Sequence, residues 1–283
     1  MTALSHHFVT CQNLEIHYTA WGERSAPLVI LWHGLTRTGR DFDELAAALS
    51  DQFYVVCPDT PGRGLSQWCS DPATQYTVPF YAQLALNLME ALDVPHCDWV
   101  GTSMGGLIGM LTASLAPERI RRLVINDVAP EVPQAALARI RDYVGQLPEF
   151  QSVAELQAWL QQVYVPFGEN SAAFWQRMAL TSARRKDDGR LTLHYDPALV
   201  VPFMADNSGD LWAQWKQLAC PMLVLRGALS DLLTSALAQR MLDTNQHAQL
   251  ETIAAVGHAP TLANAEQIAL VKGFLTDQYF GGH

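Results

Sequence analysis

Residues 101–106 read Gly101-Thr102-Ser103-Met104-Gly105-Gly106 and follow the apolar pair Trp99-Val100. A Gly-x-Ser-x-Gly pattern between a strand and a helix is typical of a nucleophilic serine on a tight turn. Such a turn presses the backbone against its neighbours, and glycine tolerates this because it has no Cβ. The helix that follows has a partly positive amino end, which favours a developing oxyanion. We therefore predict that Ser103 is a nucleophile at the end of a buried strand.

Short apolar runs alternate with helical patterns on both sides of this turn. Strands are predicted at residues 8–11, 14–20, 28–32, 53–57, 99–100, 123–125, 222–225 and 249–253. Helices are predicted at residues 41–49, 78–92, 107–116, 212–218, 235–242 and 265–279. Strands that alternate with helices are covered on both faces. The sequence therefore predicts an α/β fold with a mostly parallel, eight-stranded sheet and right-handed crossovers.

The alternation stops between Pro130 and Phe203. This segment shows helical patterns at residues 134–144 and 153–163, contains many of the aromatic residues, and has no convincing strand. We interpret it as a helical cap inserted over the carboxyl edge of the sheet, where open α/β sheets bind their ligands. The predicted division is a core of residues 1–129, a cap of residues 130–206 and a second part of the core of residues 207–283.

An unactivated serine needs a base within hydrogen-bonding reach. His258 lies in Val256-Gly257-His258-Ala259-Pro260, between the last predicted strand and the last predicted helix. A loop at that place can deliver an imidazole to the carboxyl edge of the sheet. The main rival is His33, which directly precedes Gly34 at the end of a strand, where backbone amides are needed more than a ring. We predict that His258 is the base.

The imidazole needs a carboxylate that orients it and stabilises its charged form. Asp127 follows the predicted strand at residues 123–125, and Asp231 follows the strand at residues 222–225. Both keep the chain order nucleophile, acid, base, so order does not decide between them. We favour Asp231, because Gly227 and Ser230 suit a buried hydrogen-bonding turn. Asp127 is the alternative acid, and its other role would be to anchor the entry to the cap.

These motifs resemble the α/β-hydrolase superfamily, in particular its serine esterases with a helical cap. The resemblance covers the whole chain. The family's His-Gly turn matches His33-Gly34, and its Asp-x-x-Gly-x-Gly-x-Ser segment matches residues 59–66. It implies an oxyanion hole formed by the backbone amides of Leu35 and Met104. Two preset N–H donors of this kind contribute about 3–4 kcal/mol each in acyl transfer.

The nucleophile narrows the reaction that this resemblance implies. Haloalkane dehalogenases and epoxide hydrolases of this fold carry Asp at the turn, whereas Ser103 supports acyl-enzyme chemistry. Carbon–carbon hydrolases of ring-cleavage products usually have a glycine-rich stretch after His-Gly and Asn before the nucleophile. Here residues 35–38 read Leu-Thr-Arg-Thr, and Thr102 precedes Ser103. We expect a hydrolase of small carboxylic esters or lactones, with a carbon–carbon hydrolase and a non-catalytic ligand-binding protein as alternatives.

Four side chains are candidates for binding the substrate. Trp159 and Trp175 could form an apolar roof over the pocket, although packing between cap helices explains each of them equally well. Arg37 and Arg40, next to the expected oxyanion loop, could bind a substrate carboxylate. The charged run at residues 184–190 is most simply a solvated loop.

Composition excludes several classes of partner. The chain carries 18 Lys and Arg against 28 Asp and Glu, a formal net charge of −10, which argues against nucleic acid and anionic membrane surfaces. It lacks a membrane-length apolar run and the features of a secretory signal. Five scattered cysteines indicate reduced thiols in a cytoplasmic protein. No metal or organic cofactor is expected, and the chain is expected to be a monomer or homodimer.

Overall fold

The computed structural model describes residues 4–204 and 210–276. Its main sheet has eight strands in the order β1-β2-β4-β3-β5-β6-β10-β11. Their bounds are β1 Ser5–Cys11, β2 Leu14–Trp21, β3 Leu28–Trp32, β4 Tyr54–Pro58, β5 Cys97–Thr102, β6 Ile120–Asn126, β10 Met222–Gly227 and β11 Ala248–Ile253. Strand β2 runs antiparallel to β1 and β4, and the remaining pairs are parallel. The predicted mostly parallel sheet is confirmed.

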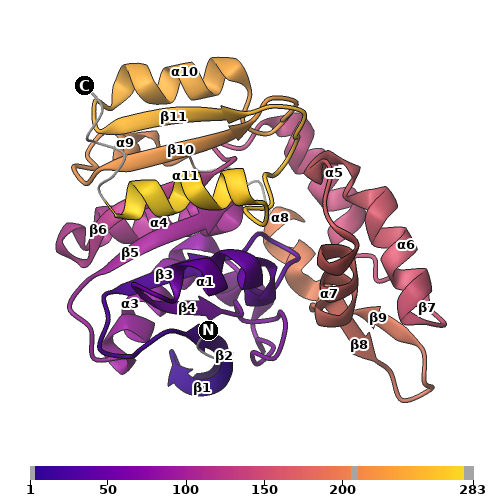
Figure 1. Ribbon diagram of the computed structural model, residues 1–283. Coiled ribbons are helices and arrows are strands. Elements are labelled where there is room, and N and C mark those ends of the chain that lie inside the picture. Colours follow the sequence, from indigo (N-terminus) through magenta and orange to yellow (C-terminus); the bar gives the residue numbers. More distant parts are fainter. Residues whose placement is uncertain (1–3, 205–209, 277–283) are drawn as a thin grey trace.

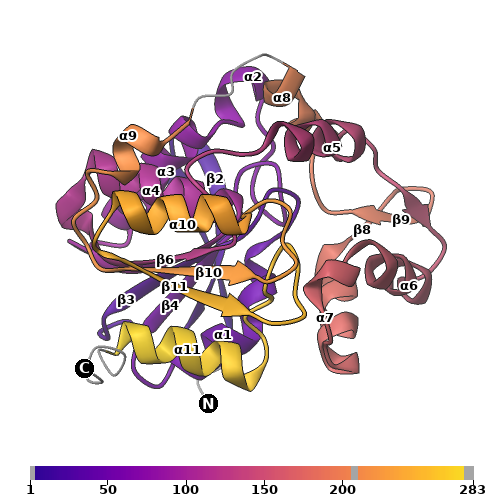
Figure 2. The same ribbon diagram turned by 90° about the horizontal axis from the view of Figure 1, so that it is seen from above.

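Helices cover both faces of this sheet (Figures 1 and 2). One face packs against α1 (Asp43–Leu49) and α11 (Ala265–Leu275). The other packs against α3 (Val78–Ala91), α4 (Met104–Leu115), α9 (Trp212–Trp215) and α10 (Ser235–Thr244). Strand β3 shows why both faces are buried: Val29 and Leu31 point into one core, and Ile30 and Trp32 point into the other. Burial on both faces explains its uninterrupted apolar sequence.

The segment that the sequence predicts to be a cap follows β6 and lies beside the core in both views (Figures 1 and 2). Its helices are α5 (Gln134–Val144), α6 (Val153–Val163), α7 (Ala172–Ser182) and α8 (Val201–Met204). It also contains a three-stranded sheet in the order β7-β9-β8, with β7 Glu149–Phe150, β8 Ala183–Arg185 and β9 Leu191–Leu193. The prediction of a cap without strands is therefore wrong. Strands of two or three residues are too short to show an alternating pattern.

Short helices complete the described part of the chain. They are η1 (Gly39–Phe42), α2 (Pro72–Gln75), η2 (Pro117–Arg119), η3 (Val165–Phe167) and η4 (Pro197–Val200). The predicted end of the last helix at residues 277–279 and the predicted cap boundary at residues 206 and 207 lie outside the described residues. None of the helices within residues 4–204 and 210–276 is both long enough and apolar enough to cross a membrane.

The turn between β5 and α4 is packed so closely that two of its positions admit only glycine. A Cβ on Gly101 would lie 2.1 Å from the carbonyl oxygen of Gly105, and a Cβ on Gly105 would lie 2.0 Å from the carbonyl oxygen of Trp32. Both neighbours are backbone atoms, which cannot move aside as a flexible side chain can. The two glycines of the Gly-x-Ser-x-Gly pattern are thus required by the close contact of α4 with the ends of β3 and β5.

This packing predicts opposite effects for two Gly→Ala substitutions in helices. Gly105→Ala should lower the free energy of unfolding by about 3 kcal/mol or more, because overpacking against backbone must displace α4. Gly273→Ala in α11 is the matched control, since a Cβ there meets no atom within 4 Å. It should raise stability by up to about 1 kcal/mol through helix propensity. Urea denaturation measures both, and equal effects would contradict the packing argument.

Candidate active site

Ser103 stands at the junction of β5 and α4 in a backbone conformation that side-chain-bearing residues rarely adopt. Its φ is +53° and its ψ is −114°. The amide of Ser103 donates to the carbonyl of Asn126 at 2.8 Å, and its carbonyl accepts from Gly106 at 2.8 Å. Such a backbone conformation costs about 1–3 kcal/mol of folding free energy and persists only where surrounding contacts hold it in place. The strain lifts the hydroxyl clear of the sheet end.

His258 lies between Ser103 and a carboxylate. Its Nε2 is 3.0 Å from Oγ of Ser103, and its Nδ1 is 2.8 Å from Oδ2 of Asp127. Because a carboxylate accepts and does not donate, the Nδ1–H donates to Asp127 and Nε2 is left to accept the serine proton. The His258 side chain is 24% exposed, so the ring is partly open to solvent. The structure thus brings the predicted nucleophile and the predicted base into contact.

The carboxylate of Asp127 is completely buried and receives three hydrogen bonds. Oδ1 accepts from the amide of Gly227 at 2.8 Å, and Oδ2 accepts from the hydroxyl of Ser230 at 2.6 Å and from His258. Its backbone φ of +61° turns the side chain back from the end of β6 towards the β10 loop. A buried charge is tolerated only when hydrogen bonds replace its lost hydration. These three donors supply that replacement.

Asp231, which the sequence favours as the acid, is placed elsewhere. Its side chain is 58% exposed and forms an ion pair with Arg139 of cap helix α5. The hydrogen bond from Arg139 lowers the pKa of Asp231 below its ordinary value. The structure corrects the predicted pairing: the turn at Gly227 and Ser230 does bury a hydrogen-bonding network, but that network receives Asp127 from the neighbouring strand. Asp231 follows Ser230 and points outward from the same turn.

Asn126 connects the loops that carry the three side chains, and its sequence position alone did not single it out. Its Nδ2 donates to Oγ1 of Thr102 at 2.9 Å and to the carbonyl of Pro260 at 2.8 Å, while its carbonyl accepts from Ser103. The next residue is Asp127. One buried amide therefore ties the serine turn to the histidine loop. The sequence signal for this role was a polar residue directly before an aspartate at the end of a strand.

The two residues expected to form the oxyanion hole meet at one buried arginine. Nε of Arg63 donates to the carbonyl of Leu35 at 2.8 Å, and its Nη2 lies 3.5 Å from Sδ of Met104. A Cβ on Gly34, the residue before Leu35, would lie only 3.7 Å from Cβ of Ser103. The loop with the Leu35 amide and the start of α4 with the Met104 amide are therefore neighbours of the hydroxyl.

Arg63 is completely buried, yet within the described residues no carboxylate forms an ion pair with it. Its remaining contacts are the carbonyl of Pro61, the hydroxyl of Tyr81, and the faces of the Tyr76 and Tyr81 rings. Carbonyl dipoles and aromatic faces thus stabilise the guanidinium in place of an anion. Arg63 occupies a variable position of the glycine-rich segment at residues 59–66, so the motif did not single it out.

His33, the rival base, is fully buried and engaged on both ring nitrogens. Nδ1 donates to the carbonyl of Gly34 at 2.7 Å, and Nε2 accepts from the amide of Thr60 at 2.9 Å. Burial lowers the pKa of His33 to about 4, so the ring is neutral at ordinary pH. It holds together the loops that follow β3 and β4.

The four predicted substrate-binding side chains lie in different surroundings. Arg37 pairs with Asp41 and lines a cavity of about 40 Å³ beside Gly34. Arg40 lines a larger cavity described below. Trp159 and Trp175 pack within the cap, their rings 5.5 Å from Phe150 and 5.2 Å from Phe174 respectively. No group of three or more potential metal-ligating His, Cys, Asp or Glu side chains occurs among the described residues.

Comparison with known proteins places this geometry in context. The sequence pattern of the Alpha/beta hydrolase family matches residues 29–270. The chain is 40% identical to a 3-hydroxybutyrate-oligomer hydrolase of Cupriavidus necator, over 92% of each chain. It is 24% identical to 3-oxoadipate enol-lactonase 2 of Acinetobacter baylyi, over 92% of this chain and 91% of that one. An alpha/beta hydrolase structure from Novosphingobium aromaticivorans superimposes with a TM-score of 0.88 at 35% identity, covering 98% of this chain and 99% of that one. The fold expected from the sequence is confirmed.

The geometry predicts which aspartate matters for turnover. Asp127→Asn should lower kcat by about ten-thousandfold, because an amide cannot stabilise the imidazolium and favours the wrong tautomer of His258. Asp231→Asn is the matched control and should change kcat by about twofold or less, since it removes one exposed ion pair. Ester hydrolysis by the two purified variants, with circular dichroism to check folding, measures this. The reverse ranking would return the acid role to Asp231.

Burial of His33 also predicts a pH dependence of stability. The unfolded chain binds a proton on this ring with a pKa near 6.5, whereas the folded protein does so near 4. The buried, neutral ring of His33 makes its full contribution to stability above pH 6.5, and this contribution is lost as the pH falls towards 4. The expected loss is about 2 kcal/mol between pH 7 and pH 5. The His33→Gln variant has no titrating ring at this position. Between pH 7 and pH 5, its free energy of unfolding should therefore fall by that amount less than the free energy of unfolding of the native protein. An unchanged slope would contradict the assignment.

Proposed function

Because the chain belongs to the alpha/beta hydrolase family, we propose that it is a serine hydrolase that cleaves the ester bonds of short hydroxy-acid oligomers. The observation that carries this proposal is the position of His258, within hydrogen-bonding distance of both Ser103 and Asp127. A base held between a hydroxyl and a buried carboxylate can take a proton from the hydroxyl at neutral pH.

The first half of the reaction forms an acyl-enzyme. Oγ of Ser103 attacks the ester carbonyl carbon while Nε2 of His258 takes the hydroxyl proton, and Asp127 stabilises the resulting imidazolium. The carbonyl oxygen becomes an oxyanion that accepts hydrogen bonds from the amides of Leu35 and Met104. Collapse of this intermediate breaks the ester carbon–oxygen bond, and His258 gives its proton to the departing alcohol.

The second half frees the acid. A water molecule replaces the alcohol, gives a proton to Nε2 of His258 and attacks the acyl carbon. The second oxyanion uses the same two amides. When it collapses, the bond to Oγ of Ser103 breaks, the serine regains its proton from the imidazolium, and a carboxylic acid leaves. No redox partner enters this sequence.

The substrate class rests on likeness to named relatives. The relative at 40% identity is named a hydrolase of 3-hydroxybutyrate oligomers, which are linear esters with a hydroxyl at one end and a carboxylate at the other. Small lactones are the second candidate class, because an enol-lactonase is 24% identical over most of the chain. A lactone is an intramolecular ester and would use the same steps.

We further infer a cytoplasmic location. All five cysteines are free, and four of them are buried. Burial raises the pKa of Cys11, Cys69 and Cys220 to about 11, which keeps these thiols protonated and unreactive. Free buried thiols are usual in proteins of a reducing compartment.

The nucleophile assignment has a direct test. The native protein should cleave the linear dimer of 3-hydroxybutyrate and p-nitrophenyl butyrate, and Ser103→Ala should lower kcat/KM for both by about ten-thousandfold or more. Ser50→Ala, which removes a hydroxyl at the end of α1, is the matched control and should leave both rates unchanged. A fluorophosphonate should label native protein on Ser103.

Other results would point to the alternatives. Cleavage of a vinylogous diketone in preference to both esters would favour a carbon–carbon hydrolase. Native protein that neither cleaves esters nor reacts with the fluorophosphonate would favour a ligand-binding protein on this fold.

A further inference from the structure

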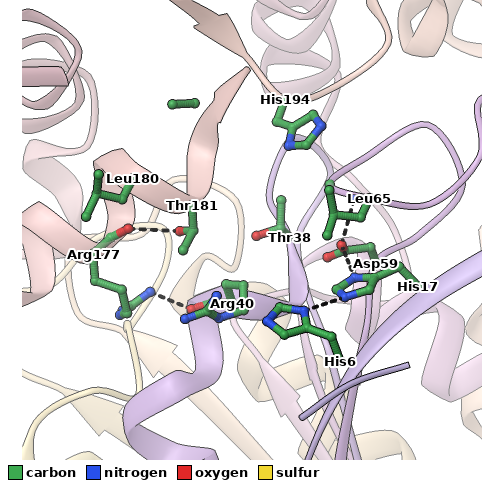
Figure 3. Close-up of a pocket in the computed structure, with 12 residues that line it drawn as sticks. His6, His17, Thr38, Arg40, Asp59, Leu65, Arg177, Leu180, Thr181 and His194 are labelled. Atoms are coloured by element: carbon green, nitrogen blue, oxygen red, sulfur yellow. Dashed lines mark hydrogen bonds and ion pairs between the residues drawn. The ribbon is translucent and has the colours of Figure 1, made fainter. Parts of the chain in front are cut away.

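A cavity of about 470 Å³ lies between the core and the cap, away from the catalytic side chains. Figure 3 shows side chains of cap helix α7 on one side of it and side chains of β1, β2 and the loops after β3 and β4 on the other. We call it the His/Arg pocket and define it by six of its polar side chains: His6, His17, Thr38, Arg40, Arg177 and His194. Leu65, Leu180 and Ala183 supply apolar wall.

The acidic groups of this region are already satisfied by the protein. Asp59, the one carboxylate in the lining, accepts from the amide of Gly39 at 2.8 Å, the amide of Leu65 at 2.9 Å and Nδ1 of His17 at 2.7 Å. Burial alone would raise the pKa of Asp59, but these hydrogen bonds outweigh it and hold the pKa below its ordinary value. This carboxylate therefore has little capacity to attract a cation from solution.

One of the basic groups keeps an unused donor. Nε and Nη2 of Arg40 donate to Asp43 of α1, so its hydrogen bonds to the described residues leave Nη1 free to donate into the pocket. Arg177 donates to Glu44 of α1 and to the carbonyl of Arg40. Nδ1 of His17 donates to Asp59, so its Nε2, 2.8 Å from Nδ1 of His6, accepts from that ring, and both nitrogens of His17 are engaged within the protein. Among the basic side chains that line the pocket, Arg40 thus keeps an unused donor.

Thr38 supplies an independent sign of a ligand. Its side chain lines the pocket, the residue is only 4% exposed, and its Oγ1 makes no hydrogen bond to any described residue. A buried hydroxyl without a partner costs about 1–3 kcal/mol, so a ligand atom that bonds to it would recover that cost. Figure 3 shows this hydroxyl between Arg40 and Asp59.

We propose that the His/Arg pocket binds a carboxylate carried on a short aliphatic chain. The carboxylate would accept hydrogen bonds from Arg40 and Thr38, and the chain would lie against the leucine side chains. A carboxylate suits this lining because it accepts several donors at once and carries the charge that the guanidinium groups favour.

The position of the pocket suggests where this carboxylate comes from. Thr38 follows Leu35 by three residues, a span of at most about 11 Å. Helix α7 also links the two regions, since Phe174 lines the small cavity beside Gly34 whereas Arg177 lines the His/Arg pocket. The acid end of a hydroxy-acid oligomer whose ester lies at Ser103 is one source, and this assignment rests on the proposed function. A free hydroxy acid released by the reaction is the other source.

Binding of the carboxylate is tested with butyrate as the probe and butyramide as its neutral analogue. Butyrate should shift the ¹⁵N imidazole signals of His6, His17 or His194 in the native protein, and butyramide should not.

Thr38→Val should weaken butyrate binding about tenfold, in keeping with loss of one hydrogen bond to a charged group, and its Tm should stay equal or rise. Arg40→Gln should weaken binding at least as much. Arg24→Gln, an exposed arginine in the loop after β2 at the opposite edge of the sheet, is the control. No imidazole shift, or equal binding by Thr38→Val, would overturn the proposal.

Kinetics then separate the two sources. If the pocket holds the end of the substrate, Thr38→Val should lower kcat/KM about tenfold for the linear 3-hydroxybutyrate dimer and leave its methyl ester within about twofold. If the pocket holds a free acid, butyrate should still bind to the native protein. The kcat/KM of Thr38→Val should then equal that of the native protein for both esters. Should the native protein cleave neither ester, the proposed function fails, and the butyrate titration still decides whether the pocket binds a carboxylate.

Discussion

The buried charge of Asp127 is the constraint on which the arrangement of the site depends. An ionised carboxylate without water must be surrounded by donors, and here two come from the turn after β10, the amide of Gly227 and the hydroxyl of Ser230, and one from the ring of His258. Meeting this requirement places the β10 loop and the histidine loop around the end of β6. The distances from His258 to Ser103 and Asp127 follow from an electrostatic need of the folded protein itself.

The cap completes the position of the histidine loop. The amide of Gly257 donates to the carbonyl of Pro166 at 2.7 Å, and the hydroxyl of Thr261 donates to Asn170 at 3.0 Å. Both bonds flank His258 and join it to the segment around η3. The ring is thus oriented by Asp127, while the loop that carries it is held by the segment around η3.

Much of this site could be predicted from local sequence, and the part that could not has a definite physical cause. Ser103 and His258 stand in short motifs whose chemistry depends on neighbours in the chain. The choice between Asp127 and Asp231 depends on which way two donors of the β10 loop point, and that is a property of adjacent strands. The contacts of Arg63 to Leu35 and Met104 join segments 28 and 41 residues apart. A spacing rule that applies within one segment cannot predict contacts between segments that are distant in the sequence.

A second carboxylate–imidazole pair shows what distinguishes the candidate active site from a structural contact. Nδ1 of His17 lies 2.7 Å from Asp59, nearly the same distance as Nδ1 of His258 from Asp127. Both carboxylates are buried and both accept backbone amides. The difference lies at Nε2, which faces a strained serine hydroxyl in one case and the ring of His6 in the other. The carboxylate therefore sets the orientation of the ring, while the chemistry of the pair is decided by the group that the opposite nitrogen meets.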